Sequence, residues 1–202
     1  MRPQPRRPQQ DDDGLVEACR RGDREALHAV FSAHAPYLER MLIRIVGPSP
    51  DVADLLQTTF LGAIRAFPNF RGEAQVRTWL ARIAIRTAQE RLRSADRRRR
   101  ADLPGLEESA DNRGRHQHVE QDVDARRKLA RLYTHLEAIG AKKRVAFVLH
   151  VFEGHPIDEV AALTGASVTA TKSRVFWARR ELLRRAARDP LLRDLIARGG
   201  EP

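Results

Sequence analysis

The chain has 202 residues, which is enough for one large domain or two small ones, and an aromatic content of 5% predicts small aliphatic cores. A formal net charge of +10 favours a polyanionic partner. The single cysteine, Cys19, excludes an internal disulfide, and no apolar run reaches the roughly 18 residues that a membrane-spanning helix needs.

Residues 1–13 are rich in proline and arginine and lack the apolar core that follows the basic residues of a secretory signal. We therefore expect a short disordered arm on a cytoplasmic protein that does not insert into a membrane. From residue 14 onward the apolar residues recur with helical spacing, and no stretch alternates as a strand would. The sequence accordingly predicts an all-α fold.

Four helices are expected between residues 14 and 97, which we interpret as one small helical domain. The turn after the second helix is marked by Gly47, Pro48 and Pro50, and the third helix ends at Pro68. The expected helices cover residues 15–34, 37–46, 51–67 and 74–97.

Residues 98–124 contain Pro104, Gly105 and Gly114 and have few large apolar residues. Within them, residues 102–124 hold seven acids against two arginines, a net charge of −5. We interpret the segment as a flexible acidic linker. The apolar pattern resumes over residues 125–187, which predicts a second small helical domain, and residues 188–202 form a weakly amphipathic tail.

Residues 157–182 carry the most informative pattern in the chain. An apolar-spaced helix runs to a turn centred on Gly165, and a second helix follows with Lys172 and Arg174 beside its buried stripe. Glycine suits such a turn because it adopts a positive φ without steric penalty. The pattern is typical of a helix-turn-helix, whose second helix lies in the DNA major groove. Helix spacing alone favours two packed helices of any α-domain equally well.

Positive charge is concentrated in two blocks. Residues 71–100 hold ten arginines against three acids, a net charge of +7, and residues 172–188 hold seven Lys and Arg against one acid, a net charge of +6. Because the acidic linker separates the blocks, the distribution indicates two nucleic-acid-facing modules on one chain.

Four segments carry a resemblance to a known family. They read Asp51-x-x-Asp54-Leu55-x-Gln57-x-x-Phe60; Asn69-Phe70-Arg71-Gly72 with Thr78-Trp79-Leu80; Arg82-Ile83-Ala84 through Arg91-Leu92-Arg93; and Phe152-Glu153-Gly154 with Ile157-Asp158-Glu159-Val160-Ala161 and Lys172-Ser173-Arg174. In this order and spacing they resemble bacterial sigma factors of the sigma-70 family, in particular the compact extracytoplasmic-function (ECF) group. The resemblance implies sigma region 2 for residues 14–97 and sigma region 4 for residues 125–187.

The resemblance implies that helix 51–67 docks on core RNA polymerase, whose β′ and β subunits are the expected partners. Asp51, Asp54 and Gln57 share one polar face of that helix, and an acidic patch on so basic a chain suits a protein surface better than DNA. Asp51 fits a helix-capping role equally well. The residues expected to carry the polymerase contact are Asp51, Asp54, Leu55, Gln57 and Phe60.

Helix 74–97 and the loop before it are expected to read and melt the −10 promoter element. Arginines recur along one side of the helix, beside an apolar stripe, as a helix facing a phosphate backbone requires. Aromatic and Arg side chains hold unpaired bases by stacking, although Trp79 fits the core equally well. The expected residues are Asn69, Phe70, Arg71, Trp79, Arg82, Arg86, Gln89 and Arg93.

The second helix of the helix-turn-helix is expected to read the −35 element. Lys172 should hold a phosphate, Ser173 and Arg174 should reach base edges, and Phe176 could touch a thymine methyl. The residues expected on the DNA face are Thr169, Lys172, Ser173, Arg174, Phe176, Trp177 and Arg180. The residues expected to pack inward are Val168, Thr171, Val175, Ala178 and Leu182.

The chain departs from the family pattern at Arg86, where asparagine is common, and at Trp177, where arginine is frequent. Two other hypotheses are a helix-turn-helix regulator that binds duplex DNA without polymerase, and an adaptor whose basic blocks only solubilise it. No catalytic constellation is visible, and His116 and His118 have no cysteine nearby to complete a metal site. We therefore expect no enzyme activity, cofactor or metal. The resemblance also implies control by an anti-sigma factor.

Overall fold

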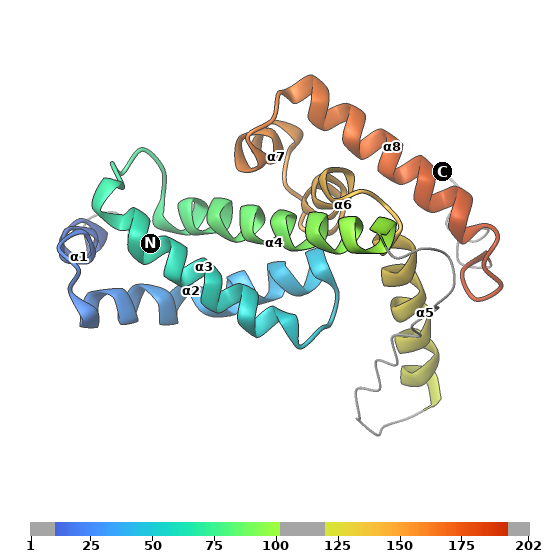
Figure 1. Ribbon diagram of the computed structural model, residues 1–202, viewed down its shortest axis with the longest axis horizontal. Coiled ribbons are helices and arrows are strands. Elements are labelled where there is room, and N and C mark those ends of the chain that lie inside the picture. Colours follow the sequence, from blue (N-terminus) through green and yellow to red (C-terminus); the bar gives the residue numbers. More distant parts are fainter. Residues whose placement is uncertain (1–10, 102–119, 194–202) are drawn as a thin grey trace, which may run out of the picture.

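The computed structural model describes residues 11–101 and 120–193 (Figure 1). Those residues form α-helices joined by turns and contain no strand, which confirms the predicted all-α fold. The α-helices are α1 (Asp11–Arg20), α2 (Arg24–Val46), α3 (Asp51–Ala66), α4 (Val76–Ala101), α5 (Glu120–Glu137), α6 (Ala141–Phe147), α7 (Ile157–Thr164) and α8 (Val168–Ala186). A 3-10 turn, η1 (Phe67–Asn69), follows α3, and a π-helical turn, η2 (Val148–Phe152), follows α6.

The first two helices divide at a different place from the predicted one. α1 ends at Arg20, Gly22 turns the chain with φ 82°, and the Asp23 carboxylate caps α2 by accepting from the backbone N–H of Glu25 and Ala26. The predicted break between residues 34 and 37 was wrong, because α2 continues through Pro36. Apolar residues before and after Pro36 are buried on the same helix, and their packing outweighs the hydrogen bond that proline cannot donate.

Helix α4 lies at the centre of the fold. α2 and α3 pack on one side of it, and α6 and α7 pack on another (Figure 1). Leu80, Ala84 and Ala88 are fully buried, and the two alanines allow neighbouring helices to approach closely. Ile83 and Thr87, which helical spacing places on the same side as Leu80, are only half-buried, because the second packed side shifts the buried face around the helix.

The C-terminal helices form a smaller unit around α8, which packs on α5, α6 and α7. Leu136, Phe147 and Leu182 belong to its buried cluster. The chain after α8 is attached to α5, since Arg131 Nε donates to the buried Asp189 carboxylate at 2.9 Å and His135 Nε2 lies 2.8 Å from the same oxygen. The beginning of the predicted tail is therefore packed against this unit.

The two helical domains are in contact and share part of one core. Val145, Leu149 and Val160 are buried in the same cluster as residues of α2, α3 and α4. At the edge of this contact, Arg44 Nη1 donates to Glu153 Oε1 at 2.6 Å. The sequence suggested two separate bodies on a tether, and the structure instead places them against each other.

The predicted linker, residues 98–124, is helical at both described ends, because α4 continues to Ala101 and α5 begins at Glu120. Residues 102–119, which carry most of the predicted acidic linker, lie outside the described residues, as do 1–10 and 194–202. The predicted N-terminal arm also overlaps α1, which starts at Asp11. In the part of the chain that is described, no helix has the length and apolar character needed to cross a membrane.

Candidate protein and nucleic-acid interfaces

One side of α3 presents a mixed polar and apolar stripe to solvent. Asp54 and Gln57 are exposed, as predicted, and Leu61 and Ile64 continue the same stripe one and two turns further along. Leu61 is 48% and Ile64 is 41% exposed, so two large aliphatic side chains one turn apart face the solvent on this side of the helix. Neither residue was predicted to face the solvent, because an apolar residue near the buried side of a helix is ordinarily assigned to the core. Such a stripe suits a protein partner.

Three other residues predicted for this interface have different surroundings. Leu55 is buried, and the Phe60 ring is half-buried and stacked on Phe31 with centroids 4.4 Å apart. Asp51 forms an ion pair with Arg91 of α4, and its backbone N–H donates to Ser49 Oγ at 3.2 Å. In this structure Leu55 is a core residue rather than a surface contact, and the available carboxylate of the stripe is that of Asp54.

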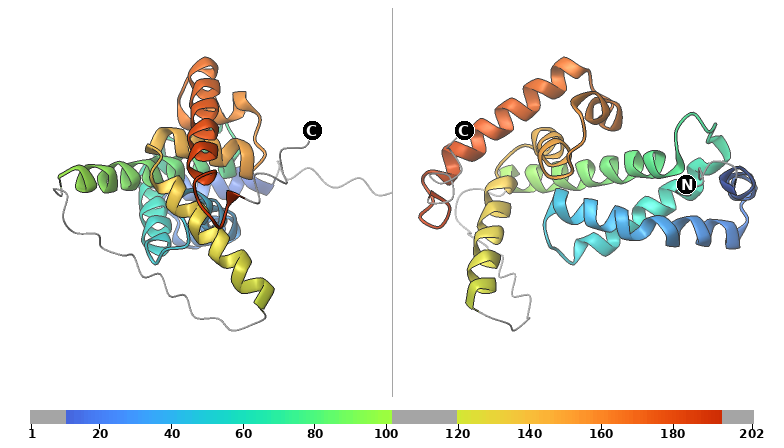
Figure 2. Two further views of the ribbon diagram at one scale, coloured as in Figure 1. Left: turned by 90° about the vertical axis from the view of Figure 1, so that its right-hand side faces the viewer. Right: turned by 180° about the vertical axis from the view of Figure 1, so that it is seen from behind.

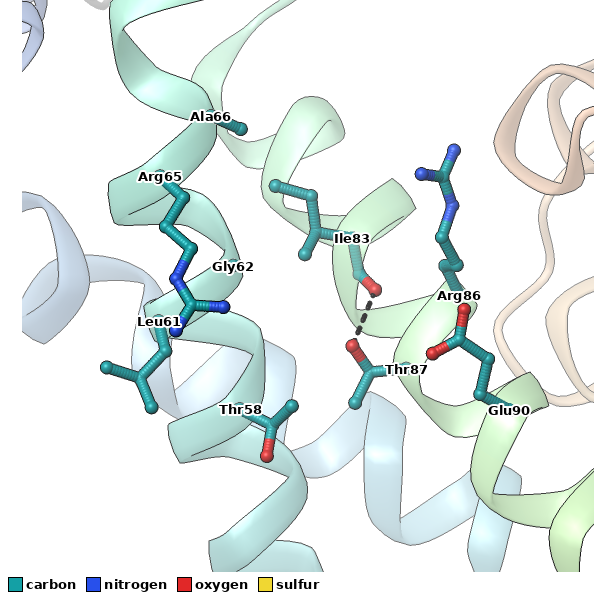
Figure 3. A pocket seen from close by; sticks show the side chains of 9 residues that line it. All are labelled: Thr58, Leu61, Gly62, Arg65, Ala66, Ile83, Arg86, Thr87 and Glu90. Carbon is teal, nitrogen blue, oxygen red and sulfur yellow. Dashed lines mark hydrogen bonds between the residues drawn. The ribbon is translucent and has the colours of Figure 1, made fainter.

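A groove of about 340 Å³ separates the exposed sides of α3 and α4 (Figure 3). Leu61 and Arg65 line it from α3, and Ile83 and Arg86 line it from α4. The helices approach closely at Gly62, where a Cβ atom would lie 3.4 Å from Ile83 Cγ2. The groove therefore joins the α3 stripe directly to the cationic side of α4.

Arg82, Arg86 and Arg93 are exposed along one side of α4, and Gln89 between them is half-buried. Among the described residues, none of the ion pairs involves these three arginines. The last turns of α4 project beyond the other helices (Figure 2). The result is a continuous cationic ridge with donors available to phosphates and bases.

The loop between α3 and α4 combines an exposed tip with a buried aromatic base. Asn69 and Arg71 are exposed, and Gly72 turns the loop with φ 76°. Phe70 is only 7% exposed, with its ring centroid 6.0 Å from that of Phe67 and 4.8 Å from that of Trp79. Phe70 thus packs in the core in this conformation and does not present its ring to a base, contrary to the expectation from sequence.

Trp79 is half-buried, and its indole packs edge-on to Phe67 at 4.7 Å. One part of the ring therefore belongs to the aromatic core, and the rest reaches the surface near the loop. Base stacking by Trp79 remains a prediction.

The predicted helix-turn-helix is confirmed as α7, a tight turn and α8. Gly165 occupies the left-handed region with φ 62°, as the turn was expected to require. Ser167 caps α8 by accepting a hydrogen bond from the backbone N–H of Ala170 at 3.2 Å. This cap was not predicted, although serine before a helix is a strong start signal.

Thr171, Ala178 and Leu182 of α8 are buried and Val175 is half-buried, as predicted. The prediction for Val168 was wrong: this first residue of α8 is 44% exposed. Of the residues expected on the DNA face, six are exposed and Arg174 is half-buried; the exposed ones are Thr169, Lys172, Ser173, Phe176, Trp177 and Arg180.

The outward face of α8 is unusual in its aromatic content. Phe176 is 57% and Trp177 is 51% exposed, with their rings 5.3 Å apart in an edge-on arrangement. The Arg180 guanidinium lies 5.6 Å from the Trp177 ring, within cation–π range. Exposed aromatic rings bordered by arginine are suited to contact with DNA, where apolar groups can meet thymine methyls.

A polar network supports the base of this face. Lys143 Nζ of α6 donates to Glu181 Oε2 at 2.9 Å, and Arg185 Nη2 donates to the other oxygen at 3.2 Å. The hydrogen bond from Lys143 is the main cause that lowers the pKa of the Glu181 carboxyl, and Arg185 adds to it. Glu181, the one acid in the second basic block, therefore fixes α8 on α6 rather than facing the solvent.

Comparison with known proteins assigns both domains. The sequence matches two protein-family models, Sigma-70 region 2 over residues 30–98 and Sigma-70, region 4 over residues 129–182. It is 30% identical to the RNA polymerase sigma-H factor of Pseudomonas aeruginosa, over 92% of this chain and 98% of that protein. It is also 30% identical to the ECF RNA polymerase sigma-E factor of Escherichia coli, over 83% of this chain and 90% of that protein.

Solved structures share the fold. CnrH, in complex with the cytosolic domain of CnrY, aligns with a TM-score of 0.57 at 27% identity, over 83% of this chain and 92% of CnrH. The sigma factor RpoE of Bartonella quintana, in complex with the anti-sigma factor NepR, aligns with a TM-score of 0.53 at 22% identity, over 79% of this chain and 92% of RpoE. With the family matches and the helix-turn-helix geometry, the chain belongs to the sigma-70 family of RNA polymerase sigma factors, in its ECF group.

Proposed function

We propose that this chain binds core RNA polymerase through the exposed stripe of α3, reads and opens the −10 element with α4 and the loop before it, and reads the −35 element with α8. The observation that supports this proposal most directly is the pair of adjacent surfaces in region 2. One carries Asp54 with exposed apolar side chains, and the other carries Arg82, Arg86, Gln89 and Arg93, with the exposed Glu90 at its edge. A protein that must hold polymerase and DNA together needs two such surfaces of opposite charge.

The mechanism is one of binding without covalent chemistry by the protein, in keeping with the non-catalytic role of the family in initiation. Arginines of α4 neutralise phosphates, which provides affinity but no sequence information. Stacking on exposed side chains contributes about 1–3 kcal/mol per base, which offsets part of the cost of unpairing the promoter. Membership of the family favours this function over a regulator that acts without polymerase.

We further propose that the two domains separate when the chain works. The −35 and −10 positions lie about 25 base pairs apart, which is roughly 85 Å at about 3.4 Å per base pair. α4 has 26 residues and is therefore about 39 Å long. α7 packs on it, and only three residues separate α7 from α8. Two surfaces this close cannot reach both elements at once, so region 4 must leave α4 on the promoter.

An anti-sigma factor is the regulator that we propose for this chain, because two solved relatives of its fold were captured with a bound partner, one of them named as an anti-sigma factor. A partner that holds regions 2 and 4 together would keep the chain in the packed arrangement described above. Action on bacterial RNA polymerase would place the chain in the cytoplasm.

Co-elution with core polymerase tests the proposed polymerase surface. Asp54→Arg introduces a cation where a basic partner surface is expected, and like charges across an interface cost several kcal/mol. We expect the wild-type chain to co-elute with bacterial core RNA polymerase, and the variant to bind at least about tenfold more weakly. Glu39→Arg, an exposed charge reversal on α2, is the matched control and should bind as the wild type does. Equal binding by all three chains would contradict the assignment of α3.

A further inference from the structure

A long-range hydrogen bond joins α1 to the loop that we propose opens the promoter. Arg20, the last residue of α1, donates from Nε to the backbone carbonyl oxygen of Phe70 at 2.7 Å. The same guanidinium donates from Nη1 to Glu17 Oε2 at 2.9 Å, so two acceptors fix its orientation. α1 also packs on η1, the turn from which the loop begins.

The Phe70 peptide is the last point at which the loop is attached before its exposed tip. The Phe70 amide donates to the Phe67 carbonyl oxygen at 2.9 Å, and the Phe70 ring is buried. Beyond it the chain runs through the exposed Arg71 and Gly72, and the next backbone hydrogen bond between described residues is donated by Trp79 to the Gln75 carbonyl oxygen at 3.0 Å. Loss of the bond to the Phe70 carbonyl would therefore release the start of the tip.

We propose that Arg20 is a positioning residue for promoter opening. By binding the Phe70 carbonyl, it fixes the plane of the peptide that precedes Arg71 and so sets the direction in which Arg71 meets unpaired bases. Burial of the Phe70 ring alone does not fix that peptide, because rotation about ψ of Phe70 moves the carbonyl while leaving the ring in place. This inference rests on the proposed melting role of the loop.

Arg20 suits this task because its guanidinium is planar, always charged and offers several donors in a fixed arrangement. A hydrogen bond from a charged donor to a carbonyl is stronger than one between neutral groups. Preorganised groups are effective because they need not be ordered at the moment of reaction. Without Arg20, the loop tip would have to become ordered during promoter melting, and the entropy lost in that ordering would slow opening.

The test compares Arg20→Ala with Arg21→Ala in holoenzyme assembled from the full chain and bacterial core RNA polymerase. Arg21 is the neighbouring arginine; it lies only 3.9 Å from Glu17 and makes no bond to the loop, which makes it a matched control. Each holoenzyme is measured on a promoter that the wild type transcribes, once as a full duplex and once with mismatches that keep the −10 region open. Permanganate reactivity of unpaired thymines reports opening, and core binding and thermal unfolding are measured beside it.

We expect Arg20→Ala to lower opening of the duplex promoter about tenfold, a ratio equivalent to roughly 1.4 kcal/mol, and to act as the wild type does on the pre-opened template. Arg20→Lys, which retains one charged donor, should recover part of the activity. Arg21→Ala should match the wild type on both templates.

Two results would overturn the inference. One is equal opening of the duplex by Arg20→Ala and Arg21→Ala. The other is an equal loss on duplex and pre-opened templates, which would mean that Arg20 only stabilises the domain. Failure of the wild-type holoenzyme to open any promoter would instead refute the proposed function itself, so the two failures are distinguishable.

Discussion

Three arginines on α4 should determine how strongly promoter binding depends on salt. Arg82, Arg86 and Arg93 are exposed on one side of the helix, and no ion pair between described residues occupies them. Each is therefore free to neutralise a phosphate when the holoenzyme binds DNA. Replacing all three by glutamine keeps hydrogen-bonding groups and removes three positive charges.

The size of the effect follows from counterion release. Each phosphate contact contributes about 0.9 to the slope of log K against log salt on duplex DNA, and about 0.7 on single strands. Losing three contacts should lower the slope by about 2.7 or about 2.1 respectively. Between about 50 mM and 200 mM salt, the wild type should lose roughly 20-fold to 40-fold more affinity than the triple variant.

Filter binding of holoenzyme to a labelled promoter over that salt range measures the slope. The control is a second triple variant, with Arg21, Arg24 and Arg40 changed to glutamine, since these exposed arginines lie on α2 or just before it and the net charge changes equally. Its slope should match that of the wild type. If both triple variants lower the slope to the same extent, the effect comes from net charge alone and the cationic ridge has no specific role.

Three further predictions concern stability and conformation. Gly165→Ala should lower the free energy of unfolding by about 1–2 kcal/mol, because Gly165 has φ 62° and an alanine is strained in that conformation even with open space around it. Gly14→Ala, in a helix and also in open space, should leave the free energy of unfolding unchanged or raise it. Urea melts in which both substitutions change the free energy of unfolding with the same sign would contradict this. The pKa of the Asp189 carboxyl is lowered, first by the hydrogen bond from the Leu191 backbone N–H and then by His135 and Arg131. The ionised Asp189 carboxylate should therefore stabilise the fold fully above the ordinary carboxyl pKa, and this stabilisation should disappear as the pH falls through the lowered pKa. Urea melts across acidic pH should show the gap between wild type and Asp189→Asn closing, and a gap independent of pH would refute the assignment. Fluorophores placed on regions 2 and 4 should lose energy transfer when core polymerase is added, and unchanged transfer would contradict separation of the two regions.

The parts of this fold that local chemistry determines could be predicted from the sequence. The turn at Gly165 needs a residue that adopts positive φ, and apolar spacing on both sides defined α7 and α8. The start of α2 at Arg24 was not predicted, because the apolar spacing continues across the turn at Gly22, and burial along the whole of α2 overrides Pro36. In such cases the burial of apolar side chains outweighs the low helix propensity of a single residue.

The arrangement of the candidate surfaces depends on tertiary packing and was predicted less completely. The exposed positions of Asp54, Arg82 and Arg86 follow from helical spacing alone. The burial of Phe70 and the exposure of Leu61 do not, because both depend on which neighbouring helix covers which face. The bond from Arg20 to the Phe70 carbonyl joins residues 50 positions apart and has no signature in local sequence.

Run-off transcription tests the central claim most directly. The purified chain is mixed with bacterial core RNA polymerase and a library of genomic DNA fragments, and the 5′ ends of the transcripts are mapped. We predict discrete start sites that require both the chain and core polymerase and that share upstream −35 and −10 sequences. Transcripts without common start sites, or tight sequence-specific binding of duplex DNA by the chain alone with no effect on polymerase, would contradict it.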